Sequence, residues 1–151
     1  MKDLLNTLSE IQIKYNPKVS AFDRPQIKSS QDAFIQFMLF LDTQQFYIKE
    51  EAAVLYLNRA NRVIGGYKLS MGGITGTIVD IRIILGIALK SLSCGIIIAH
   101  THPSGELVPS TNDRDFTLKL KEAGKVMDIK LLDHLIIAEG RFYSFADEGV
   151  I

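Results

Sequence analysis

Two histidines, His100 and His102, stand one residue apart at the end of a short apolar run that predicts a buried strand over residues 95–100. Side chains alternate along a strand, so both imidazoles point to the same side and can reach one ion. Imidazole nitrogens are good zinc ligands, and a catalytic zinc takes three protein ligands and a water. Asp113 can supply the third ligand, because it lies in the first turn of a predicted helix, where the helix dipole favours an ionised carboxylate. The spacing therefore predicts a site for one divalent metal, with zinc the favoured ion.

Each of these residues also has an ordinary structural interpretation. A histidine at the end of a buried strand is more often a hydrogen-bonded core residue than a ligand. Ser110, three residues before Asp113, is typical of a helix N-cap. The preceding loop carries Pro103, Gly105 and Pro109, whose turn chemistry can bring the aspartate back toward the histidines. Taken together, two histidines on one face and a carboxylate and a hydroxyl at the next helix start favour a metal site.

Periodicity along the chain predicts alternating strands and helices. Apolar runs predict strands at residues 10–15, 52–57, 62–70 and 95–100, and short closing strands at residues 129–132, 135–138 and 142–145. Helix starts are predicted at Ser29 or Ser30, at Asp80, and at Ser110 or Thr111. The glycine-rich residues 71–76 predict a sharp turn. This order favours an α/β sandwich with a mixed sheet.

Composition is that of an ordinary globular protein. The 151 residues suffice for one domain with a buried core, and Lys plus Arg equal Asp plus Glu at 17 each. The formal net charge of zero gives no whole-molecule attraction to nucleic acid or to an anionic membrane. The apolar residues 81–100 are too short to span a bilayer, and the first residues lack a signal-peptide pattern, so we expect a cytoplasmic protein. The single cysteine, Cys94, lies in an apolar run and is expected to be a buried, inert thiol.

The stretch from His100 to Asp113 resembles the motif of a known metalloprotease family. Its spacing, H-x-H-x7-S-x2-D with Ser110 as the serine, is that of the JAMM (MPN-plus) motif. The segments HPSG at residues 102–105, LDHLI at residues 132–136 and YSFADEG at residues 143–149 more narrowly resemble the bacterial RadC-like JAB domain. The resemblance covers residues 50–151, and the full set of spacings is a far stronger signal than an isolated H-x-H.

The resemblance implies a JAB/JAMM-type α/β fold, cytidine-deaminase-like, in which helices sandwich a mixed β-sheet. It also implies a zinc-dependent hydrolase acting on a peptide or isopeptide bond, with zinc held by His100, His102 and Asp113. Residues 50–151 would form this domain, and residues 1–49 an N-terminal extension of one strand and one helix. That extension shows no sign of the helix-hairpin-helix module that usually precedes RadC domains, which weakens any inference of DNA binding.

The resemblance also implies the catalytic residues. In the family a glutamate from an earlier strand acts as general base toward the attacking water, and the motif serine, here Ser110, steadies the oxyanion. The glutamate is Glu50 or Glu51, which lie on opposite faces of the strand, and periodicity does not choose between them. Aligning residues 54–58 with the corresponding strand of the family favours Glu50.

A second function stays open at this point. The chain could be a DNA-repair or mobile-element accessory protein that binds DNA or a protein partner and holds a non-catalytic metal. An intact set of ligands with Ser110 and an upstream glutamate favours catalysis, because a structural zinc usually has four protein ligands. Metal-assisted phosphodiester hydrolysis is less favoured, since the sequence offers one metal site.

Two nearby residues receive structural interpretations. His134 is a candidate fourth ligand or a partner of a ligand, but the resemblance supports no zinc contact, and a hydrogen-bonded core histidine is favoured. Asp115 lies roughly 200° around the helix from Asp113, so we expect it to face away from the site.

Overall fold

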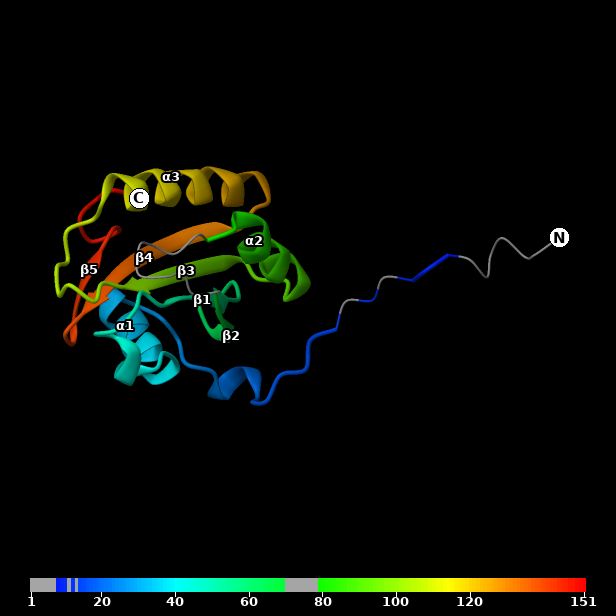
Figure 1. The fold of residues 1–151 in the computed structure, drawn as a ribbon. Coiled ribbons are helices and arrows are strands. Elements are labelled where there is room, and N and C mark those ends of the chain that lie inside the picture. The colour runs from blue at the N-terminus through cyan, green and yellow to red at the C-terminus, as the bar shows by residue number, and fades with distance from the viewer. Residues whose placement is uncertain (1–7, 11, 13, 70–78) are drawn as a thin grey trace.

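The fold is one mixed β-sheet with helices on both faces, as the computed structural model shows (Figure 1). The structure describes residues 8–10, 12, 14–69 and 79–151. Within them the strands are β1 (Ala52–Leu57), β2 (Val63–Lys68), β3 (Gly95–Thr101), β4 (Lys130–Ala138) and β5 (Arg141–Ser144). The strand order is β2-β1-β3-β4-β5; β3 and β4 run parallel, and the other neighbouring pairs run antiparallel. The predicted α/β sandwich with a mixed sheet is confirmed.

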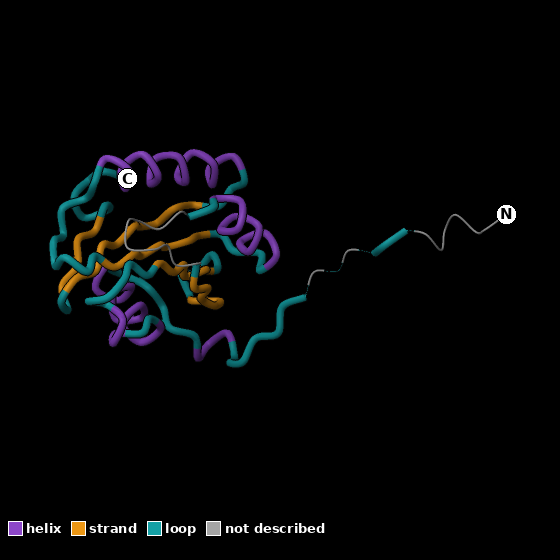
Figure 2. The backbone as a smooth tube through the Cα atoms, in the orientation of Figure 1, coloured by secondary structure: helices purple, strands orange, loops and turns teal. Residues whose placement is uncertain are grey.

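Three α-helices pack against this sheet, each starting at a predicted cap. They are α1 (Ser30–Phe40), α2 (Ile81–Lys90) and α3 (Thr111–Val126). The side chains of Ser29, Asp80 and Ser110 accept hydrogen bonds from backbone N–H groups of the first turns, which have no partner within the helix. Helix α1 lies on one face of the sheet and helices α2 and α3 lie on the other (Figure 2).

Alternation along the central strands divides the core into two parts. Ala53, Leu55 and Leu57 of β1 face α1, and Ala52, Val54 and Tyr56 face α2 and α3. Ala52 pairs with His100 on β3, so the side chain of His100 lies on the α3 face. The parallel pair β3 and β4 is connected through α3, a β-α-β crossover that brings the start of α3 back to the end of β3 where His100 lies.

Strand β4 departs from the predicted pattern, because two short strands were expected at residues 129–132 and 135–138 and the structure has one continuous strand. The polar pair Asp133 and His134 does not interrupt it, because both side chains are buried and hydrogen-bonded. Asp133 accepts from the Ser144 hydroxyl and from the amides of His134 and Ala146. Burial raises the pKa of the Asp133 carboxyl despite these donors. A register shift in the pairing with β3 occurs just before Asp133.

The structure also bears on the predictions for Cys94, for two N-terminal and glycine-rich segments, and for membrane-spanning helices. Cys94 is exposed rather than buried, because β3 begins only at the next residue and Cys94 lies in the bend that precedes it. The strand predicted at residues 10–15 lies partly outside the described residues, and the described ones there form no strand. The predicted turn at residues 71–76 lies wholly outside them. Within the described part of the chain, no helix has both the length and the apolar character needed to cross a bilayer.

The packing of α3 against the start of β4 gives a testable prediction. A Cβ added at Gly124 would clash with the backbone oxygen of Ile129, whereas one added at Gly86 of α2 would meet open space. We therefore expect Gly124→Ala to lower the free energy of unfolding by about 2 kcal/mol. Gly86→Ala should raise it by about 0.5–1 kcal/mol through helix propensity. Chemical denaturation measures both, and equal effects would contradict the close approach of α3 to β4.

Candidate metal centre

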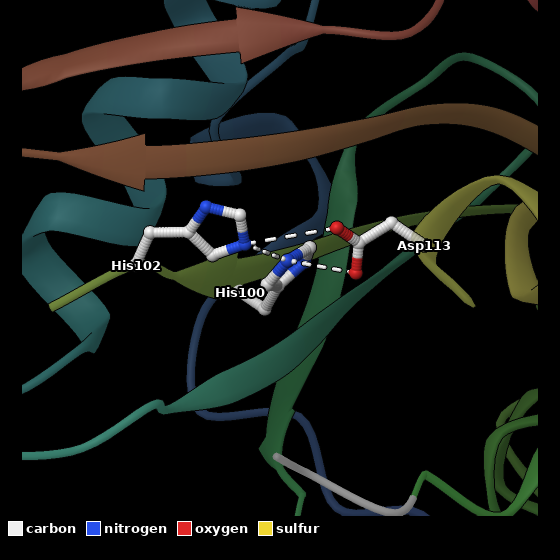
Figure 3. Close-up of side chains that lie close together, drawn as sticks. All are labelled: His100, His102 and Asp113. Atoms are coloured by element: carbon white, nitrogen blue, oxygen red, sulfur yellow. Dashed lines mark hydrogen bonds and ion pairs between the residues drawn. The ribbon is translucent and has the colours of Figure 1, made fainter. Parts of the chain in front are cut away.

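Three side chains from two elements converge at the end of β3. His100 lies in the strand, His102 follows it directly, and Asp113 lies in the first turn of α3. One potential ligand atom from each lies within 4.8 Å of the other two. Figure 3 shows the two imidazoles and the carboxylate pointing toward one another. The structure thus brings together the three residues that the sequence predicts, and their role as ligands stays a prediction.

The distances between the facing nitrogen and oxygen atoms are close to those between ligand atoms around a single metal ion. Nε2 of His100 lies 2.9 Å from Nε2 of His102. Nε2 of His100 lies 3.3 Å from Oδ1 of Asp113, and Nε2 of His102 lies 3.7 Å from Oδ2. Ligand atoms of a tetrahedral zinc, with bonds of roughly 2.0–2.1 Å, stand about 3.3 Å apart. The residues present therefore fit a small divalent cation.

The loop after His102 fixes the tautomer of that histidine. Nδ1 of His102 lies 2.8 Å from the backbone oxygen of Glu106. A carbonyl oxygen can only accept, so Nδ1 carries a proton, and in the neutral imidazole Nε2 then has the lone pair that a metal ligand needs. Gly105 makes this geometry possible: its φ of 82° is favourable for glycine, and its N–H donates to the His102 oxygen, which closes a turn. The sequence predicted the turn, but not that it would hold a histidine.

Asp113 is held from the other side by its own helix cap. Its Oδ2 accepts from the Ser110 N–H at 2.7 Å, and its N–H donates to Ser110 Oγ at 3.0 Å, which forms a capping box. Burial by itself raises the pKa of the Asp113 carboxyl, but interactions with His100 and Ser110 outweigh it and hold the pKa well below its usual range. The carboxylate is thus ionised, as a metal ligand must be.

A cavity of about 140 Å³ opens beside these residues on the α3 face of the sheet. Its lining includes Glu50, His100 and Asp113, together with Ala52, Val79, Ile98, Asn112, Phe116 and His134. Glu51 is only 3% exposed and is not among the residues that line this cavity. Of the two glutamates, it is Glu50 that lines the cavity with His100 and Asp113, and their placement on opposite faces stays a prediction. Its role as general base stays a prediction.

Two roles were predicted for Ser110, a helix N-cap and a hydrogen-bond donor to the substrate oxygen. It is the N-cap of α3, as the structural interpretation expected. Its Oγ accepts from the Asp113 N–H, and this bond leaves the hydroxyl proton available for a second acceptor. Ser110 is exposed and is not among the residues that line the cavity, and its donor role toward substrate stays a prediction.

A family model for the RadC-like JAB domain matches residues 27–150. The chain belongs to this family. The match begins N-terminal to the boundary predicted at residue 50 and includes α1, whose Phe37 packs in the same core as Leu55 of β1. The observed sheet and helices are those of a JAB/MPN-type fold.

Several bacterial relatives of this RadC-like JAB domain carry the name UPF0758 protein. The one from Flavobacterium johnsoniae is 47% identical over 125 residues, which are 83% of this chain and 53% of the relative. The one from Aquifex aeolicus is 39% identical over 128 residues, 85% of this chain and 54% of the relative. The chain thus spans about half the length of the curated relatives it matches.

Two further residues of the RadC-like JAB domain, His134 and Thr117, form hydrogen bonds that lead to the candidate ligands. His134 is 1% exposed, and its Nε2 lies 2.7 Å from Nδ1 of His100. Its Nδ1 lies 2.6 Å from Oγ1 of Thr117, so it is the hydrogen-bonded core histidine expected, and also the partner of a candidate ligand. Burial and the neighbouring His100 hold the pKa of His134 well below its usual value. No sequence pattern pointed to Thr117. Asp115 is exposed and outside the cluster, as expected.

Proposed function

We propose that this RadC-like JAB domain is a zinc-dependent hydrolase of peptide or isopeptide bonds. The observation that carries the proposal is the convergence of His100, His102 and Asp113, with Glu50 in the cavity beside them. Membership of the family supports it, since the family motif is the one whose residues converge. The zero net charge does not favour a nucleic-acid substrate.

The donor set favours a catalytic rather than a structural ion. Two imidazoles and one carboxylate are three protein ligands, and structural zinc sites have four. Within the described residues the cluster comprises these three. Residues 70–78, which the structure does not describe, contain no His, Cys, Asp or Glu. When bound, zinc would act as a Lewis acid and allow water to serve as a nucleophile near neutral pH.

The remaining chemistry belongs to the side chains of the chain itself. The Glu50 carboxylate would take the proton from the attacking water and return it to the leaving amine. The Ser110 hydroxyl would donate to the substrate oxygen, on which negative charge develops in the transition state. This donor raises the rate rather than ground-state binding, because the charge it stabilises is absent from the substrate. Thus Glu50 would move the proton and Ser110 would hold the oxygen.

Metal content of the purified chain tests the proposal. We expect about one zinc per wild-type chain by elemental analysis and none in His102→Ala, which leaves two ligands. Cys94→Ser is the matched control, because Cys94 is an exposed thiol and can bind zinc by chance. It should keep the wild-type metal content. A wild-type chain that stays metal-free after incubation with zinc would rule out the hydrolase.

A further inference from the structure

A chain of short hydrogen bonds runs behind the candidate metal site. It starts at Nδ1 of His100, which lies 2.7 Å from Nε2 of His134. It continues from Nδ1 of His134 to Oγ1 of Thr117 at 2.6 Å. It ends where Thr117 Oγ1 donates to the backbone oxygen of Asp113 at 2.5 Å. Two buried residues thus connect the backbone of one candidate ligand to the imidazole of another.

The end of the chain fixes its direction. A carbonyl oxygen carries no proton, and two oxygens at 2.5 Å repel each other unless a proton lies between them, so the single hydroxyl proton of Thr117 points at Asp113. Thr117 Oγ1 must therefore accept from His134, which places a proton on Nδ1 of His134.

The same reasoning continues to the metal site. His134 is 1% exposed, and at such a buried position a charged imidazolium with no carboxylate bonded to either ring nitrogen is unfavourable. A neutral His134 with its proton on Nδ1 has a bare Nε2, which accepts from Nδ1 of His100. His100 then carries its proton on Nδ1 and presents the lone pair of Nε2 to His102 and Asp113. The opposite direction would place a proton on Nε2 of His100, inside the ligand cluster.

We propose that Thr117 and His134 are positioning residues that set the tautomer of His100, so that its Nε2 is always available as a metal ligand. The inference rests on the metal site of the proposed function. Residues outside the cluster would then set the tautomers of both candidate histidine ligands. The Glu106 carbonyl would set that of His102, and Thr117 would set that of His100 through His134.

The chemical nature of the group that accepts from Nδ1 of His100, here His134, also affects how much electron density His100 would donate to the metal. A carboxylate in that place would add negative charge through the imidazole and raise the basicity of the ligand. A neutral imidazole adds none, so Asp113 is the one anionic member of the cluster. We expect this arrangement to leave more of the positive charge of the ion available to polarise a substrate oxygen.

Thr117→Val and Thr117→Ser form a matched pair for the test. Valine keeps the shape of threonine without the hydroxyl, and serine keeps the hydroxyl. In Thr117→Val the Nδ1 proton of His134 has no acceptor, so the proton moves to Nε2 and forces His100 into the wrong tautomer. We expect zinc affinity, measured by competition with a chromophoric chelator, to fall about 10- to 100-fold in Thr117→Val and to stay near wild type in Thr117→Ser.

The tautomers can be read directly in metal-free protein. Long-range 1H–15N spectra of histidine-labelled protein should show His100 and His134 protonated on Nδ1 in wild type, and the chain has only 3 histidines to assign. A proton on Nε2 of His100 in wild type, or unchanged zinc affinity in a folded Thr117→Val, would overturn the proposal. The spectra of wild type decide even if Thr117→Val fails to fold. They also decide if wild type binds no zinc, so this failure is separate from that of the proposed function.

Discussion

Glu50→Gln is expected to lower hydrolysis by about 10²- to 10⁴-fold while the zinc content stays at the wild-type level. The carboxylate of Glu50 lines the cavity with His100 and Asp113 but is not one of the three clustered ligands. Glutamine has nearly the same shape and cannot take up a proton, so the variant removes the proposed proton transfer and leaves the ion in place. Initial rates on the best peptide or isopeptide substrate of the wild type measure the effect, beside elemental analysis.

Glu51→Gln is the matched control, since Glu51 is the neighbouring glutamate and does not line the cavity. Its side chain is buried, and Oε2 has no hydrogen-bond partner among the described residues. The substitution changes a buried side chain that does not line the cavity, so we expect wild-type rates. The reverse pattern, with Glu51→Gln inactive and Glu50→Gln active, would show that the general base was assigned to the wrong residue.

The candidate ligands could be predicted from the sequence because their placement depends on local rules. His100 and His102 share a side because side chains alternate along β3, and Asp113 reaches them because a capping box starts α3 beside the strand end. The choice of Glu50 over Glu51 needed the family resemblance, since alternation alone only separates the two. The prediction that Cys94 is buried was wrong, because a sequence pattern indicates a buried strand but not the residue at which burial begins.

The residues behind the ligands could not be predicted, because their contacts depend on the register between β3 and β4. His134 pairs with Ile98 only after the register shift that precedes Asp133. Without that shift, every later side chain of β4 would lie on the other face, and His134 would point away from His100. No local pattern marks such a shift. From the sequence, Thr117 is an ordinary polar residue of an amphipathic helix, and only the structure shows its hydrogen bond with His134.

Zinc is expected to raise the melting temperature of the metal-free chain by about 10 °C at saturating concentration. A ligand that binds only the folded state contributes about 4 kcal/mol at a thousandfold excess over its Kd. The physical reason lies in the cluster, where Nε2 of His100 and Nε2 of His102 lie 2.9 Å apart beside an ionised Asp113. A cation would be bound by all three side chains in the folded chain, and the unfolded chain does not hold the three ligands together. Differential scanning fluorimetry with zinc or with a chelator measures the shift.

Asp113→Asn and Asp115→Asn separate this effect from non-specific binding. Both remove one negative charge from the same helix, but only Asp113 belongs to the cluster, and Asp115 is exposed. We expect the zinc-dependent shift to disappear in Asp113→Asn and to persist in Asp115→Asn. Equal shifts in the two variants would place the bound zinc elsewhere on the surface.

Acid should remove the zinc-dependent shift and also lower the stability of the metal-free chain. Zinc needs neutral imidazoles, so protons compete for the site as the pH falls. In the metal-free chain the pKa of His134 is well below the ordinary value of roughly 6.5. Below about pH 6.5 the unfolded chain therefore binds a proton that the folded chain excludes, and stability decreases with falling pH by at most about 1.4 kcal/mol per unit for this group. The two effects are separable, because the loss of stability due to His134 occurs without zinc. The difference between the melting temperatures with and without zinc instead reports competition between protons and zinc for the site. A gap that stayed constant from about pH 8 to about pH 5 would contradict imidazole ligands.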